Sequence, residues 1–184
     1  MIRHFCNQAR PVTTPRPAIA SLTVKGMPVS AIGNIELLKH ENKLGLLCSR
    51  ACPGEMILKT YDLMQRSRDE GRCVISGFHS AVEKDCLRIL LRGKQPIIIC
   101  PARSLVGIRV PAEWKQGLEQ KRLLLLSAFS ENLRRPTKHV ARQRNELVVA
   151  LADEVFIAHI APGGQMARLS QRITVRGTPI LRLD

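Results

Sequence analysis

Aromatic side chains are scarce in this sequence, with one Trp, one Tyr and four Phe among 184 residues. A core with so few rings must be built from Leu, Ile, Val and Ala, which suits a sheet covered by helices. The sequence also has no apolar run of membrane-spanning length and no basic amphipathic helix. We therefore expect a folded domain that has no membrane partner.

Acidic residues are scarce as well, because 15 Asp and Glu stand against 29 Lys and Arg, which leaves a formal net charge of +14. Such an excess places a polyanion first among candidate partners. Twenty of the basic residues are Arg, the side chain that pairs bidentately with phosphate and stacks on bases. This composition favours nucleic acid as the ligand.

The six cysteines include no Cys-x-x-Cys pair, and their spacing matches no zinc site. We interpret them as small buried side chains of a reduced, cytoplasmic protein, and we predict no metal and no cofactor. They are Cys6, Cys48, Cys52, Cys73, Cys86 and Cys100.

The first 27 residues have the composition of a linker, with several prolines and scattered Arg and Thr. They lack the long apolar core of a signal peptide. We therefore expect a flexible basic arm over residues 1–27 and one domain over residues 28–184, which begins with a connecting segment, 27–43. A domain of that length can bury a core of its own.

From Leu44 onward, apolar runs of strand length alternate with periodic stretches of helix length, which is typical of βαβ units. The runs predict strands at 44–49, 73–76, 96–100, 123–127, 155–159 and 179–183. The periodic stretches predict helices near 54–70, 81–91, 113–120, 138–151 and 165–175. The predicted fold class is α/β, a Rossmann-like open and mostly parallel sheet of about six strands with helices on both faces.

Small and basic residues follow several of the predicted strands, and ligands of open α/β sheets bind at the carboxyl ends of the strands. Two adjacent glycines also precede the last helix, where a loop backbone could hold a phosphate, although a tight turn is an equally good explanation. These residues are Ser49 and Arg50, Ser76 and Gly77, and Gly163 and Gly164.

The predicted helix 138–151 begins after Thr137, a plausible N-cap, and its first two turns are basic, although the helix dipole favours acidic residues there. A bound phosphate would offset this charge, and screening by solvent on an exposed face is the alternative. Arg144 lies near the apolar stripe of the helix, so we expect it to point inward at the edge of the site. The basic residues are Lys138, His139, Arg142 and Arg144.

Ser80 and Glu83 have the spacing of a capping box, so we interpret Glu83 as a brace of the helix start and not as a catalytic acid. The neighbouring His79 has no obvious carboxylate to orient it, which favours a loop histidine over a general base. We predict no catalytic residue.

Four short motifs then occur in a known order. Cys48-Ser49-Arg50 is similar to a Gly-Ser-Arg motif, and residues 76–83 are similar to Ser-Gly-x-Ala-x-Gly-Ile-Asp. Arg144-Asn145-Glu146 is similar to Arg-Asn-Arg, and residues 163–168 to Gly-Ser-x-x-Thr-Ala. From about Leu44 to Leu183 the chain thus resembles the DNA-processing protein A family, DprA or Smf. It departs from the family pattern at Cys48, His79, Ala81 and Glu146, and at the closing Ser and Thr.

This resemblance implies a Rossmann-like core that binds single-stranded DNA and acts in DNA processing, uptake or recombination. It also implies a recombinase as a candidate partner, and we consider a homodimer. The length leaves no room for the accessory domains that often flank the family's core, so we expect a stand-alone relative. The candidate nucleic-acid or phosphate-binding residues are Ser49, Arg50, Ser76, Gly77, Lys138, Arg142, Arg144, Asn145, Gly163 and Gly164.

An alternative is a nucleotide-binding sensor or an enzyme related to the LOG-type phosphoribohydrolases, which carry Pro-Gly-Gly-x-Gly-Thr-x-x-Glu. Pro162, Gly163 and Gly164 match the start of that pattern, but the Gly-Thr and the Glu are missing. A phosphate site needs only backbone N–H groups and an Arg, so a sensor stays open as an alternative.

Overall fold

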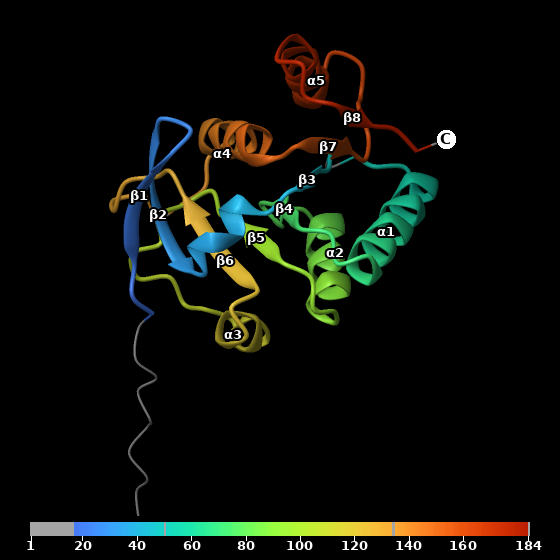
Figure 1. Ribbon diagram of the computed structural model, residues 1–184. Helices are drawn as coiled ribbons and strands as arrows, with labels where there is room; N and C mark the ends of the chain where they lie inside the picture. Colours follow the sequence, from blue (N-terminus) through green and yellow to red (C-terminus); the bar gives the residue numbers. More distant parts are fainter. Residues whose placement is uncertain (1–16, 50, 134, 184) are drawn as a thin grey trace, which may run out of the picture.

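The computed structural model describes residues 17–49, 51–133 and 135–183, which form one eight-stranded sheet with helices on both faces (Figure 1). The strands are β1 (Ala20–Val24), β2 (Met27–Gly33), β3 (Leu44–Leu47), β4 (Val74–Ser76), β5 (Ile97–Ile99), β6 (Leu123–Ser127), β7 (Glu154–Ile157) and β8 (Ile180–Leu181). The helices are the 3-10 helix η1 (Ile35–Lys39), α1 (Gly54–Asp69), α2 (Ala81–Leu91), α3 (Ala112–Glu119), α4 (Lys138–Leu151) and α5 (Gln165–Val175).

The predicted fold class is confirmed, but the predicted number of strands is wrong, because the sheet has eight strands and not six. The six predicted strands correspond to β3 through β8, and α2, α4 and α5 begin and end at the predicted residues. The periodic apolar pattern was thus a sufficient local signal for these elements.

The two additional strands, β1 and β2, form a hairpin at the edge of the sheet beside β6. Lys25 and Gly26 connect β1 to β2 with φ angles of 50° and 77°, a left-handed pair that suits a tight hairpin turn. β2 then pairs antiparallel with β6 and buries Val29 and Ala31 in the core. The arm predicted over residues 1–27 is therefore too long, because β1 lies within it, and its residues 1–16 lie outside the described part of the chain.

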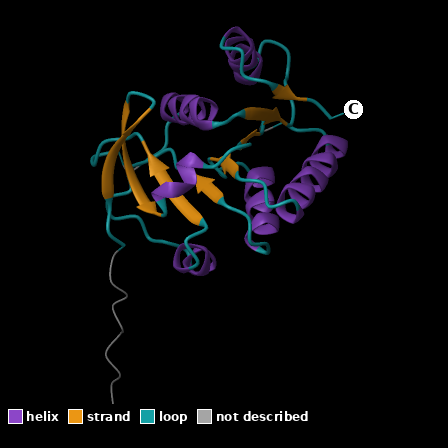
Figure 2. Ribbon diagram, viewed as in Figure 1, coloured by secondary structure: helices purple, strands orange, loops and turns teal. Residues whose placement is uncertain are grey.

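The strand order is β1-β2-β6-β5-β4-β3-β7-β8, and β3 through β8 run parallel. From β3 the chain adds β4, β5 and β6 on one side, and α4 then returns it to β7 on the other side. Figures 1 and 2 show α4 and α5 apart from α1, α2 and α3, which cover the opposite face. The strand order therefore reverses between the neighbouring strands β3 and β7, because the chain continues from them toward opposite edges of the sheet. Open α/β sheets bind ligands at such a point.

The central strands are buried on both faces, which explains their nearly continuous apolar sequences. Ile97 and Ile99 pack toward α1 and α2, whereas Ile98 between them packs toward α4. The alternation of a strand thus divides one Ile-Ile-Ile run between two core layers.

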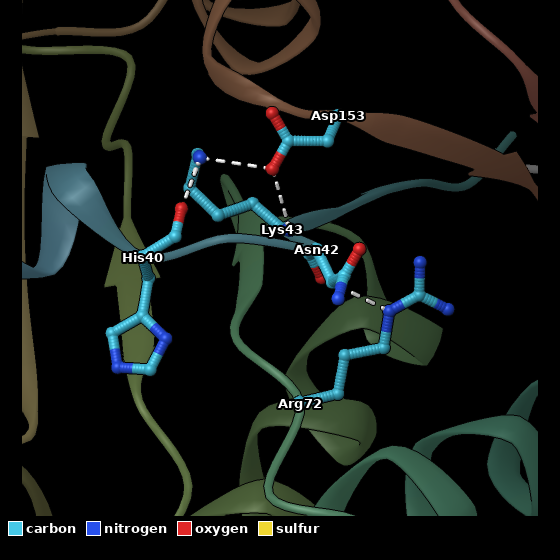
Figure 3. A network of polar contacts seen from close by, with 5 residues as sticks. All are labelled: His40, Asn42, Lys43, Arg72 and Asp153. Carbon is cyan, nitrogen blue, oxygen red and sulfur yellow. Dashed lines mark hydrogen bonds and ion pairs between the residues drawn. The ribbon is translucent and has the colours of Figure 1, made fainter.

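A polar network joins the starts of β3 and β7, at the end of the sheet away from the ligand-binding edge (Figure 3). Asp153 Oδ2 accepts hydrogen bonds from the backbone N–H of Lys43 at 2.8 Å and from its Nζ at 2.9 Å. The buried ammonium of Lys43 also donates to the carbonyl of His40, and nearby Arg72 Nε donates to the carbonyl of Asn42 at 3.1 Å. This network holds in register the two strands that meet where the order reverses.

Candidate functional site

A cavity of about 310 Å³ lies at the carboxyl ends of β3, β4 and β7, where the strand order reverses. The loops after these three strands and the first turns of α4 and α5 form its walls. The residues that line it are Cys48, Ser49, His79, Ser80, Glu83, Lys138, Ala141, Arg144, Asn145, Ala161, Gly164, Gln165 and Met166. Segments more than 100 residues apart in sequence therefore share one site.

Arg144 is the most unusual residue of this cavity. Its side chain lies in the second turn of α4, on the buried stripe of the helix, and only 5% of the residue is exposed. The expected inward orientation is therefore confirmed. Nε and Nη1 are buried without a hydrogen-bond partner, and no described carboxylate forms an ion pair with the guanidinium. A buried cation that lacks a counter-ion is costly, so its most direct explanation is an anionic ligand.

Gly77 gives the guanidinium its place. A Cβ atom on Gly77 would lie 0.8 Å from Arg144 Nη1, so the absence of a side chain at position 77 is what lets the guanidinium pack there. The next residue, Phe78, is buried and has a φ of 46°, a left-handed conformation that bulky side chains rarely adopt. Strain of this kind is common at functional sites, and here it lies directly beside the cavity.

Glu83 is a brace, as the sequence predicts. Ser80 Oγ accepts from the backbone N–H of Glu83 at 3.2 Å, and the carboxylate accepts from the backbone N–H of Ser80 at 3.0 Å, which completes the capping box of α2. The same carboxylate accepts from the N–H groups of His79 at 2.8 Å and Cys48 at 3.2 Å. It thereby ties the loop after β3 to the loop after β4, and it has little capacity left for chemistry.

The two helix starts at the cavity differ in their capping. Thr137 caps α4, because its hydroxyl accepts from the backbone N–H of Val140 at 3.2 Å. Gly164 is the N-cap of α5 and offers no side chain, so no side chain satisfies the first N–H groups of this helix. These groups begin at Gln165, which lines the cavity, and they favour an anion.

The structure separates the predicted site residues into three groups. Ser49, Lys138, Arg144, Asn145 and Gly164 line the cavity. Four others do not line it, namely Ser76, Gly77, Arg142 and Gly163. The hydroxyl of buried Ser76 accepts from the N–H of Phe78 at 3.3 Å, and Gly77 leaves space for Arg144. Arg142 is exposed on α4, and Gly163 forms the turn before α5 with a φ of 69°. Arg50 lies outside the described residues.

Several lining residues were not among the predicted ones, notably Gln165 and Met166. Their position directly after the Gly163-Gly164 turn was the signal that could have identified them. Among the predicted residues, Asn145 has an Oδ1 atom that is buried without a donor. Adjacent residues of α4 thus bring one buried unpaired cation and one buried unpaired acceptor to the cavity.

Glu146 occupies the position where the Arg-Asn-Arg motif has its second Arg, and it faces α5 instead of the cavity. Its carboxylate pairs with Arg172 at 2.5 Å and with Arg176 at 3.4 Å. These ion pairs tie α4 to α5 behind the site. The change of charge therefore serves the contact between the two helices.

The described cysteines are free thiols, and burial is the main cause that raises the pKa of each. Cys48 lines the cavity, and burial, with further contributions from Cys52 and Glu83, raises its pKa to about 12. Burial likewise raises the pKa of Cys100 to about 12, although the charge of Arg144 acts in the opposite direction. Within the described ranges, no group of three or more His, Cys, Asp or Glu side chains is arranged to hold a metal ion.

None of the helices in the described part of the chain is both long and apolar enough to cross a membrane.

A sequence model of the DNA recombination-mediator protein A family matches residues 18–165. No curated protein matches the sequence. Among solved structures, DNA processing protein A from Helicobacter pylori, described for its single-stranded DNA binding mode, is 22% identical, with a TM-score of 0.68 over 90% of this chain and 82% of that one. DNA processing protein A from Streptococcus pneumoniae is 20% identical, with a TM-score of 0.67 over 83% of this chain.

The chain covers 53% of the S. pneumoniae structure, so it spans about half the length of that relative. The molybdenum cofactor binding protein from Rippkaea orientalis is more distant, at 13% identity and a TM-score of 0.52 over 77% of this chain and 75% of that one. At these identities the solved structures are evidence for a shared fold.

Proposed function

The chain belongs to the DNA recombination-mediator protein A family, and on that premise we propose that its cavity binds single-stranded DNA. Membership of the family implies DNA processing in recombination. The DNA strand would enter at the carboxyl ends of β3, β4 and β7, with one phosphate beside Arg144. The proposal includes no catalytic step, because Glu83 is already bonded to three backbone N–H groups.

One observation carries this proposal, namely the buried guanidinium of Arg144, which has no acceptor and no counter-ion among the described residues. A phosphate oxygen would supply both, and a hydrogen bond between charged groups is about twice as strong as one between neutral groups. The uncapped start of α5 at Gly164 offers further donors to the same anion.

Charge around the cavity supports the same ligand. Lys138 lines the cavity, and Arg142 is exposed one turn further along α4. Neither side chain has a partner among the described residues. The whole chain carries +14, which favours the approach of a polyanion from a distance. A recombinase partner, a homodimer and a cytoplasmic location are compatible with this reading and remain proposals.

The test is a titration of single-stranded DNA, duplex DNA and free nucleotides, followed by fluorescence anisotropy at two salt concentrations. We expect the single strand to bind most tightly and its affinity to fall steeply with salt. Arg144→Met should weaken binding about tenfold and lower the salt slope by about 0.7, the value for one lost phosphate contact on a single strand.

Arg92→Met is the matched control, because Arg92 is an exposed arginine at the far end of α2, away from the cavity. It removes the same charge and should leave affinity and salt slope nearly unchanged. A second control removes residues 1–16 only, since a longer deletion would destroy β1. Loss of all binding on that deletion, with Arg144→Met silent, would place the DNA on the arm and overturn the proposal.

A further inference from the structure

The cavity offers more positive charge than one internal phosphate of a DNA strand can balance, because Arg144, Lys138 and the start of α5 all line it. An internal phosphodiester has two free oxygens and one negative charge, whereas a terminal phosphomonoester has three free oxygens and a charge of about −1.5 to −2 at pH 7. The donors that converge here are the guanidinium of Arg144, the ammonium of Lys138 and the uncapped N–H groups that begin at Gln165.

The size of the cavity is suited to a single nucleotide. Its volume of about 310 Å³ lies at the lower limit of small-molecule sites, which suggests room for one nucleotide. An internal nucleotide needs an exit for the strand on both sides, whereas a terminal nucleotide needs one. The walls come from three loops and two helix starts, so they surround a ligand on several sides.

Asn145 supplies a second kind of contact. Its Oδ1 is buried without a donor and lies on α4 next to Arg144. An oxygen acceptor cannot bind phosphate oxygens, but it can accept from a hydroxyl or amino group of the attached nucleoside. The pair therefore fits a ligand that is anionic at one end and carries hydrogen-bond donors at the other.

From these observations we propose that the cavity selects the phosphomonoester of a nucleotide, and that its ligand on DNA is a phosphorylated end of a single strand. This inference rests on the proposed function and adds which part of the strand enters the cavity. Arg144 is the residue that binds the terminal phosphate. Gly77 is a positioning residue, because it leaves the space that the guanidinium of Arg144 occupies.

The experiment compares four single-stranded DNAs of the same length and sequence: linear with a 5′-phosphate, linear with a 3′-phosphate, linear with a hydroxyl at both ends, and circular. We expect the phosphorylated strands to bind about tenfold tighter than the other two, the factor that one charge-assisted hydrogen bond supplies. Thymidine 5′-monophosphate should abolish this preference by competition, and thymidine should not. Competition at far lower concentrations than the DNA end requires would identify the free nucleotide as the preferred source of the phosphate.

Two variants test the assignment in different ways. Arg144→Met removes the cation, and Gly77→Ala keeps it but forces the guanidinium out of its place, which a flexible side chain permits. Both should equalise the affinities for the four DNAs, whereas Gly54→Ala, with open space around the added Cβ, should preserve the preference. Equal affinity of the wild-type protein for all four DNAs overturns this inference and leaves the proposed function standing. Absence of binding to any of them overturns both.

Discussion

Replacing Arg144 by Met should make the folded protein more stable while it weakens DNA binding. The guanidinium is buried, and Nε and Nη1 lack acceptors in the described part of the chain. Each buried donor without a partner costs about 1–3 kcal/mol. Met retains most of the apolar stem of Arg144 and removes both donors, but it leaves the space of the guanidinium beside Gly77 unfilled, a packing defect of about 1 kcal/mol.

The net gain should be about 2 kcal/mol in the free energy of unfolding. For a chain of 150–250 residues, 1 kcal/mol shifts Tm by about 2–4 °C, so Arg144→Met should raise Tm by about 4–8 °C. Differential scanning calorimetry without DNA measures this shift. A saturating single strand should then raise Tm of the wild-type protein more than that of the variant, because a ligand that binds only the folded state stabilises it.

Arg122 is the matched control, since it is also a buried arginine, but of its three nitrogens only Nη1 lacks an acceptor in the described part of the chain. Its Nε donates to Gln120 Oε1 at 3.0 Å, and its Nη2 donates to the carbonyl of Leu91 at 2.9 Å. Arg122→Met should therefore destabilise the fold by about 1–2 kcal/mol, because it leaves a carbonyl without its donor. If Arg144→Met lowers Tm as much as Arg122→Met does, Arg144 stabilises the fold, and the argument for an anionic ligand loses its basis.

The remaining predictions concern three other groups, Asp153, Cys48 and Glu83. Asp153→Ala should lower the free energy of unfolding by about 2 kcal/mol, since it leaves two donors of Lys43 without their acceptor, and an unchanged urea midpoint would contradict this. Burial would raise the pKa of Asp153, but its hydrogen bonds with Lys43 outweigh burial and lower the pKa. The contribution of Asp153 to the free energy of unfolding should therefore be complete at pH 7 and disappear as pH falls below about 4. The difference in stability between the wild-type protein and Asp153→Asn, measured against pH, checks this. The rate at which iodoacetamide alkylates Cys48, measured by mass spectrometry, should still increase from pH 8 to pH 10, because burial raises the pKa of Cys48 to about 12. A rate that stops increasing above the ordinary thiol pKa of about 8.5 would contradict this cause. Finally, the protein should release no free base from nucleoside monophosphates, and Glu83→Gln should lower Tm through the weakened capping box; base release that Glu83→Gln abolishes would favour a hydrolase instead.

Much of the fold could be predicted from local sequence, because the signals for its elements are themselves local. The apolar runs that became β5 and β6 are buried on both faces, and the start of α2 follows from the reciprocal bonds of Ser80 and Glu83. The inward orientation of Arg144 also follows from its place on the apolar stripe of α4. Helical periodicity, strand burial and capping each depend on residues within a few positions of one another.

The β1–β2 hairpin could not be predicted in the same way. The prolines that precede it and its short alternating segments have the composition of a linker, and β2 is stabilised by β6, which lies about 95 residues further along the chain. A strand of this kind acquires its stability from the edge that it covers. Its own sequence therefore carries only a weak signal, apart from the turn at Lys25 and Gly26.

The sequence by itself determined the strands from β3 to β8, the α-helices, the excess of positive charge and the brace at Glu83. Only the tertiary structure decided that β7 lies beside β3, which brings Cys48, Arg144 and Gly164 to one cavity. It also decided that Arg144 is buried without a partner, because the partner of a side chain depends on every segment that packs around it. Strand order and the surroundings of a buried charge are properties of distant contacts, and no local pattern encodes them.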